Sequence, residues 1–145
     1  MKPKLLGPGE GEVLEQRIVK IMPAENGGSY LQFESSHAPG THVPAHSHRE
    51  EDEAFYVLSG QYEFLIGETR FTATTGAFAF APRGTVHGWT YTGQEAGRLL
   101  ITVTPGTYHE GLLREVATLT EQRGRPPEMP EVAKLALKYG WVWVQ

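Results

Sequence analysis

The two most informative stretches of this 145-residue chain are GTHVPAHSHREEDEAFYVLSG (residues 40–60) and GAFAFAPRGTVH (residues 76–87). Each contains short apolar runs of strand length, separated by glycine and proline as at turns. Together they contain three histidines and a glutamate at fixed intervals: His46, His48, Glu53 and His87. Imidazole and carboxylate groups are donors that divalent transition metals accept. The two stretches therefore predict a metal site built on β-strands.

The spacing of these four residues suits convergence on one ion. His46 and His48 are two positions apart, so on an extended segment their side chains leave the same face, with α-carbons roughly 6–7 Å apart. Glu53 begins the next strand after a charged turn, and His87 follows a turn at residues 82–84. Four protein ligands on an octahedral metal leave about two positions for water, oxygen or substrate.

Other side chains are alternative or additional candidates for the site. Within the acidic run, Glu51 or Asp52 could replace Glu53 as the ligand. Three further histidines lie outside the regular spacing and could also reach the site: His37, His42 and His109. Among them His42 is preferred, because it is nearest in sequence to the predicted ligands.

Aromatic residues share a strand face with the candidate ligands. Trp89 and Tyr91 have the parity of His87, so on a regular strand they would point into the same cavity, and Phe78 and Phe80 share one face of another strand. They could bind an aromatic substrate. The alternative, which we weigh more heavily, is that they fill the interior of a small barrel, which needs bulky side chains.

The rest of the chain predicts a mainly β protein. Short strands separated by turn residues are expected at residues 17–22, 29–34, 55–58, 62–66, 70–74, 77–80, 88–92 and 98–104. Such a series indicates an antiparallel sandwich or barrel. Two short helices are expected at residues 110–119 and 128–138, followed by a strand over 141–144. Trp141 and Trp143 share one face of that strand, which would pack on the barrel or on a second subunit.

Length and composition favour one domain, with an arm at residues 1–12, a barrel at 17–104 and an extension at 105–145. The net charge of -4 and the absence of a Lys/Arg cluster argue against nucleic acid as a partner. Cysteine is absent, so nitrogen and oxygen must hold any metal. The first nine residues contain only a two-residue apolar run, which predicts neither a signal peptide nor a membrane span, and we expect a cytoplasmic protein.

The residues quoted above resemble the two motifs of the cupin superfamily. The first motif, G-x5-H-x-H-x3,4-E-x6-G, is matched from Gly40 to Gly60, and the second, G-x5-P-x-G-x2-H, from Gly76 to His87. The resemblance implies an all-β jelly roll (double-stranded β-helix) of six to ten strands with one or two short C-terminal helices. It also implies that the three histidines and Glu53 bind the metal inside the barrel. One departure is Tyr91, which occupies the asparagine position of the second motif and could change what the pocket presents.

The region from about residue 17 to 140 is similar to small single-domain cupins that resemble quercetin dioxygenase. This similarity implies a metal-dependent dioxygenase for a small aromatic or enol substrate, with Glu53 accepting the substrate hydroxyl proton. One divalent transition metal per chain is expected, and iron, manganese, nickel, copper, cobalt and zinc all suit the donors. A metal-assisted isomerase, epimerase or decarboxylase and a non-catalytic small-molecule-binding cupin remain alternatives. We also expect a homodimer, because sheet edges need protection.

Overall fold

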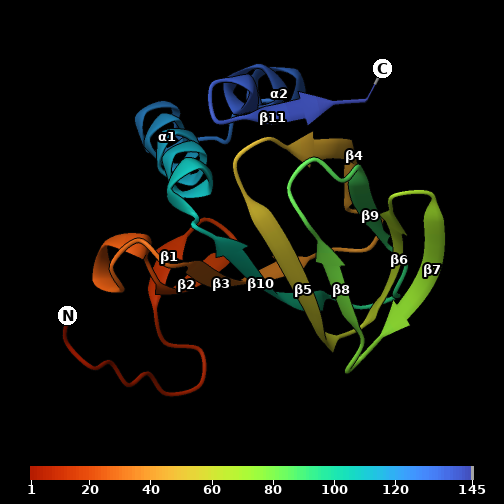
Figure 1. Cartoon of the computed structure of the whole chain (residues 1–145), viewed down its shortest axis with the longest axis horizontal. Helices are drawn as coiled ribbons and strands as arrows, with labels where there is room; N and C mark the ends of the chain where they lie inside the picture. The colour runs from red at the N-terminus through yellow and green to blue at the C-terminus, as the bar shows by residue number, and fades with distance from the viewer. Residues whose placement is uncertain (145) are drawn as a thin grey trace.

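Two antiparallel β-sheets form the body of the molecule (Figure 1), which a computed structural model describes for residues 1–144. One sheet has six strands in the order β1 (Glu12–Leu14), β2 (Arg17–Ile21), β3 (Leu31–His37), β10 (Gly97–Thr104), β5 (Asp52–Ser59) and β8 (Phe78–Ala81). The other has five strands in the order β11 (Trp141–Trp143), β4 (His42–His48), β9 (His87–Tyr91), β6 (Gln61–Ile66) and β7 (Thr69–Thr74). The all-β jelly-roll prediction is confirmed, as two facing sheets rather than one continuous barrel.

The main core lies between the two sheets and follows from the period-two alternation of the strands. In β10, for example, Leu99, Ile101 and Val103 are buried and alternate with more exposed residues. Tyr91 belongs to this core. A Cβ atom at Gly93 or Gly97 would overlap its ring, so small residues provide the space that this tyrosine occupies.

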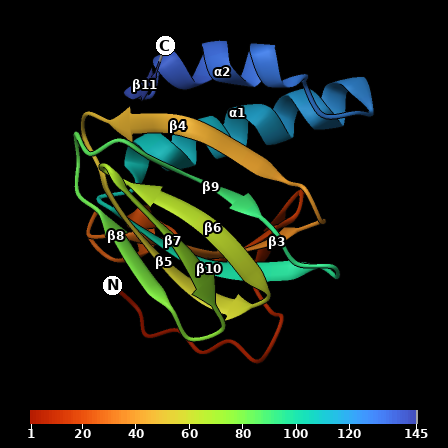
Figure 2. The ribbon, with the colours of Figure 1, turned by 90° about the vertical axis from the view of Figure 1, so that its right-hand side faces the viewer.

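A short 3-10 helix, Pro23–Glu25, connects β2 and β3, and two α-helices follow β10: α1 (Thr107–Arg123) and α2 (Met129–Leu137). The two α-helices lie on the same side of the molecule as β4 (Figure 2). Gly124 ends α1 with a left-handed backbone (φ 73°), and its N–H donates to the carbonyl of Thr120. Within residues 1–144, no helix has the length and apolar character needed to cross a membrane.

A second, smaller core joins α1, α2 and β11. Leu112, Val116 and Ala136 are buried there, and both tryptophans of β11 pack against them. β11 also pairs with β4. The tryptophan face predicted to pack on the barrel or on a second subunit therefore packs within its own chain.

The sequence did not predict β1, whose first residue, Glu12, is the last residue of the predicted arm and pairs with Val19 of β2. One other prediction about local structure is wrong. Phe78 and Phe80 do not fill the interior: they are 63% and 50% exposed, while the alanines that alternate with them in β8 are buried. The alternation was predicted correctly, but the phenylalanines lie on the outward face.

Candidate metal centre

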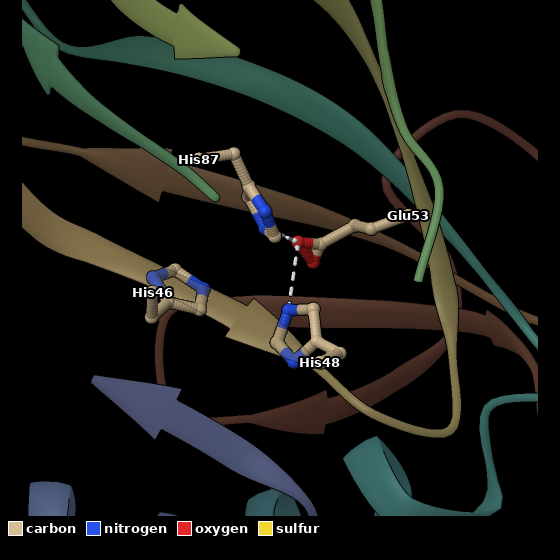
Figure 3. Close-up of side chains that lie close together, drawn as sticks. All are labelled: His46, His48, Glu53 and His87. Carbon is tan, nitrogen blue, oxygen red and sulfur yellow. Dashed lines mark ion pairs between the residues drawn. The ribbon is translucent and has the colours of Figure 1, made fainter. Parts of the chain in front are cut away.

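The three histidines and the glutamate predicted as ligands come together between the sheets (Figure 3). His46 and His48 lie on β4, Glu53 on β5 and His87 on β9. Each residue offers one donor atom, and these atoms all lie within 4.8 Å of one another. All four residues are buried, with at most 4% of their surface exposed. Strand pairing explains the convergence, because His46 is opposite His87 in the β4–β9 register.

Backbone hydrogen bonds orient two of the imidazoles. His46 Nδ1 lies 2.7 Å from the carbonyl oxygen of Pro44, and His87 Nδ1 lies 2.9 Å from that of Thr85. A carbonyl oxygen only accepts hydrogen bonds, so Nδ1 carries the proton in both rings and Nε2 of the neutral ring has a free lone pair. Both Nε2 atoms are buried without a hydrogen-bond partner, as are both ring nitrogens of His48. These orphaned nitrogens fit a group of donors that could hold a metal ion.

The charges in the cluster also suit a divalent ion. Burial raises the pKa of Glu53, but attraction to the nearby imidazoles of His48, His87 and His109 outweighs that effect and holds the pKa well below its usual range. The Oε1 atom of Glu53 lies 3.4 Å from His87 Nε2 and 3.7 Å from His48 Nε2. Burial lowers the pKa of His46 to about 3. Burial lowers the pKa of His87, but the neighbouring Glu53 carboxylate outweighs burial and raises that pKa, so a metal ion would compete with a proton for this ring. An ionised carboxylate and neutral imidazoles are the forms in which these groups bind metals.

His109, from the first turn of α1, reaches this cluster although it lies outside the two sequence motifs. Its Nε2 is 3.5 Å from Glu53 Oε2, and its Nδ1 is 3.5 Å from Glu51 Oε1. The residue is buried, with 4% of its surface exposed. Sequence alone gives little signal for it, because a helix that follows the last barrel strand sets its position.

The preference for His42 among the remaining histidines is wrong. Although His42 has the same parity as His46 on β4, the register of β4 against β9 shifts between Val43 and His46, which breaks the regular alternation. His42 is exposed, and its Nδ1 lies 2.7 Å from the hydroxyl of Thr90. His37 is buried, but it bonds to Ser35 and Tyr62 instead of joining the cluster.

The alternative acidic ligands have other partners. Glu51 is buried and accepts hydrogen bonds from the backbone N–H groups of Tyr108 and His109, at 3.1 and 2.9 Å, so it caps the start of α1. Asp52 points to the surface side and pairs with Arg83. The carboxylate that joins the three histidines is therefore that of Glu53.

A cavity of about 350 Å³ borders the cluster at His46 and Glu53. Its walls are mostly apolar and come from both sheets and both helices, as in Phe33, Val43, Phe55, Ile101, Leu112 and Val132. All three tryptophans of the chain also line it: Trp89, Trp141 and Trp143. The ring of Trp141 stacks on His46 with centroids 4.4 Å apart and planes 8° apart. Of the two aromatic residues predicted to point into the cavity from β9, Trp89 does so, whereas Tyr91 is not among the lining residues.

Comparison with known proteins points to one family. A family model described as "Cupin domain" matches residues 33–104. A protein of Aquifex aeolicus (strain VF5), named "Uncharacterized protein", is 31% identical over 102 residues, which cover 70% of this chain and 79% of that protein.

Solved structures share the fold at low sequence identity. An RmlC-like cupin from Shewanella frigidimarina NCIMB 400 has a TM-score of 0.59 and 18% identity, covering 74% of this chain and 94% of that one. A predicted oxalate decarboxylase from Thermotoga maritima has a TM-score of 0.58 and 21% identity, covering 61% and 77%. KdgF from Halomonas sp. has a TM-score of 0.55 and 19% identity, covering 61% and 76%. With the family-model match and a shared jelly-roll fold, this chain belongs to the cupin superfamily.

Proposed function

We propose that the protein is a metal-dependent, dioxygenase-type enzyme that acts on a small molecule with an aromatic or enol group. The observation that carries this proposal is the position of the cavity: largely apolar, lined by three tryptophans, and bordered at one place by His46 and Glu53. An apolar pocket with a few convergent polar groups is the usual form of a small-molecule site. Its aromatic walls can stack on a flat, unsaturated substrate.

The residues around the cluster can hold and move a proton. A divalent ion held by the three histidines and Glu53 would supply Lewis-acid and one-electron chemistry. The Oε2 atom of Glu53 can accept the proton of a substrate hydroxyl, and His109 Nε2, 3.5 Å away, is the next group along. Glu51 orients the opposite edge of the His109 ring. The apolar walls keep water away from the deprotonated substrate oxygen.

Oxygen consumption by the metal-loaded protein tests the proposal. The protein is stripped of metal, loaded separately with iron, manganese, cobalt, nickel, copper or zinc, and placed in an oxygen electrode with a flavonol and related enols. We expect oxygen uptake with at least one redox-active metal and loss of that uptake in His46→Ala. Ser47→Ala, which changes a residue of the same strand that does not line the cavity, is the matched control. No uptake with any metal and any enol contradicts dioxygenase activity.

A second candidate function is favoured by the position of His109 between two carboxylates. Such an arrangement moves protons without oxygen, as a metal-assisted isomerase or decarboxylase requires. For this candidate, zinc alone would support turnover of an enolisable acid under nitrogen. Tight binding without turnover in both gas phases would instead favour a non-catalytic binding cupin.

A further inference from the structure

The tip of the β1–β2 hairpin forms part of the cavity wall. Glu15 and Gln16 make the two-residue turn, and both line the cavity together with Arg17, the first residue of β2. Glu15 has φ 57°, a left-handed conformation that side chains other than glycine adopt at a cost. An unfavourable backbone that places a charged side chain at a cavity is typical of functional positions.

Glu15 is also unusual in its hydrogen bonding. Among the described residues, the buried side-chain oxygen and nitrogen atoms without a hydrogen-bond partner belong to the histidine cluster, to His109 and Trp141 beside it, and to Glu15. Of these atoms, only Glu15 Oε1 belongs to a residue outside the metal centre and its immediate neighbours. Buried acceptors in native proteins nearly always have a donor, so Glu15 Oε1 has a vacant position for one.

Arg17 adds donors at the same place. One of its guanidinium nitrogens lies 3.9 Å from Glu15 Oε1, which is an ion pair but too long for a hydrogen bond. No other carboxylate of the described residues lies within 4.0 Å of this guanidinium. Two nearby polar side chains of the cavity wall, Ser35 and His37, are already bonded to each other at 2.7 Å, and His37 also bonds to Tyr62. Glu15 and Arg17 are therefore the charged groups at this part of the wall that remain available to a ligand, while Gln16 between them is exposed.

We propose that Glu15 and Arg17 form a subsite for a neutral hydroxyl group of the substrate, separate from the oxygen that the metal centre binds. A hydroxyl can donate to Glu15 Oε1 and accept from Arg17 at the same time. A carboxylate has no proton for Glu15 and would be repelled by it, and an unsubstituted ring would leave both groups unsatisfied. This inference rests on the proposed function and adds to it the substrate class, an aromatic enol with a second hydroxyl at its far end.

Binding to metal-free protein tests the subsite without requiring turnover. The three tryptophans all line the cavity, so quenching of their fluorescence reports a bound ligand directly. The probes are 3-hydroxyflavone, 3,4′-dihydroxyflavone and the 4′-carboxylate of 3-hydroxyflavone, which differ only at the far end. Hydrogen bonds to charged groups predict that wild-type protein binds the 4′-hydroxyl compound about tenfold more tightly than either of the others.

Two variants separate recognition from folding. Glu15→Gly removes the carboxylate and suits the left-handed backbone, so the variant should melt at the wild-type temperature or higher and yet lose the tenfold preference. Arg17→Met keeps an apolar stem of similar length and should lose the preference as well. The matched control is Glu12→Gln, which changes a carboxylate of the same hairpin that pairs with Arg114 and does not line the cavity.

Each outcome is decisive for the subsite. Loss of the preference in both variants and its retention in Glu12→Gln support the proposal. The proposal is overturned if wild-type protein binds the three probes equally, prefers the carboxylate, or shows no saturable quenching by any probe up to millimolar concentration. It is also overturned if the preference survives in Glu15→Gly. Because no metal or oxygen is present, absence of dioxygenase activity leaves this result intact, and the two hypotheses fail separately.

Discussion

Binding of a divalent metal ion should stabilise the fold, because only the folded chain brings the four buried donor groups within 4.8 Å of one another. At a free metal concentration of 100 times Kd, linkage raises the free energy of unfolding by about 2.7 kcal/mol. In a domain of this size, 1 kcal/mol shifts Tm by roughly 2–4 °C. The expected rise in Tm is therefore about 5–11 °C.

His87→Ala should remove most of this rise. Loss of even an outer-shell partner of a metal ligand costs about 10–100-fold in affinity, and loss of a ligand should cost at least as much. If affinity falls about 100-fold, the same metal concentration only equals Kd, and the stabilisation drops to about 0.4 kcal/mol, or roughly 1–2 °C. The quantity compared is the metal-induced shift, because the substitution also removes buried packing and lowers the Tm of the metal-free protein.

Scanning calorimetry with and without each metal, followed by reversal with a chelator, measures the shift. His42→Ala serves as control, since His42 is exposed on the same strand and bonds to Thr90 instead of the cluster. It should keep the full wild-type shift. The reasoning is refuted if His87→Ala responds to metal as strongly as the wild type, or if manganese, iron, cobalt, nickel, copper and zinc all leave the wild-type Tm unchanged.

Four further predictions follow from the fold. Glu51→Ala leaves two backbone N–H groups of α1 without their acceptor and should lower the free energy of unfolding in urea by about 2 kcal/mol. The control Glu50→Ala, at an exposed position, should change it by less than about 0.5 kcal/mol, and equal effects contradict the capping role. Gly97→Ala should cost about 1–3 kcal/mol by overlap with Tyr91, and Tyr91→Leu should recover part of that loss. Burial lowers the pKa of His37 from 6.5 to about 4, so the folded state binds fewer protons than the unfolded state and stability falls as pH drops from 6.5 toward 4. His37→Gln should reduce this dependence of stability on pH, and an unchanged dependence would exclude His37 as its source. Light scattering at micromolar concentration should give twice the 16.1 kDa chain mass, and a monomeric mass contradicts the expected dimer.

The convergence of the four candidate ligands could be predicted because it depends on local spacing. His46 and His48 share a strand face by parity alone, and Glu53 and His87 follow turns whose glycine and proline residues mark the ends of strands. Such information is present within a few residues of each ligand. The same holds for the final strand, where alternation placed Trp141 and Trp143 on one face.

The remaining parts of the site depend on contacts that local sequence does not encode. His109 lies beside Glu53 because α1 starts next to the β4–β5 turn, where the Glu51 carboxylate accepts hydrogen bonds from the first amides of the helix. His42 was preferred wrongly because a register shift in β4 cannot be read from the alternation of its residues. For Phe78 and Phe80, parity gave a shared face, but hydrophobicity suggested the wrong one, since the inward positions opposite β5 are filled by alanines.

The pairing of β11 with β4 has a consequence for how the chain folds during its synthesis. β4, which holds two of the candidate ligands, leaves the ribosome well before its neighbour β11. Until then the outer edge of β4 has unpaired backbone groups, and exposed edges of this kind promote association between nascent chains. A chain cut before Trp141 should therefore tend to precipitate during expression.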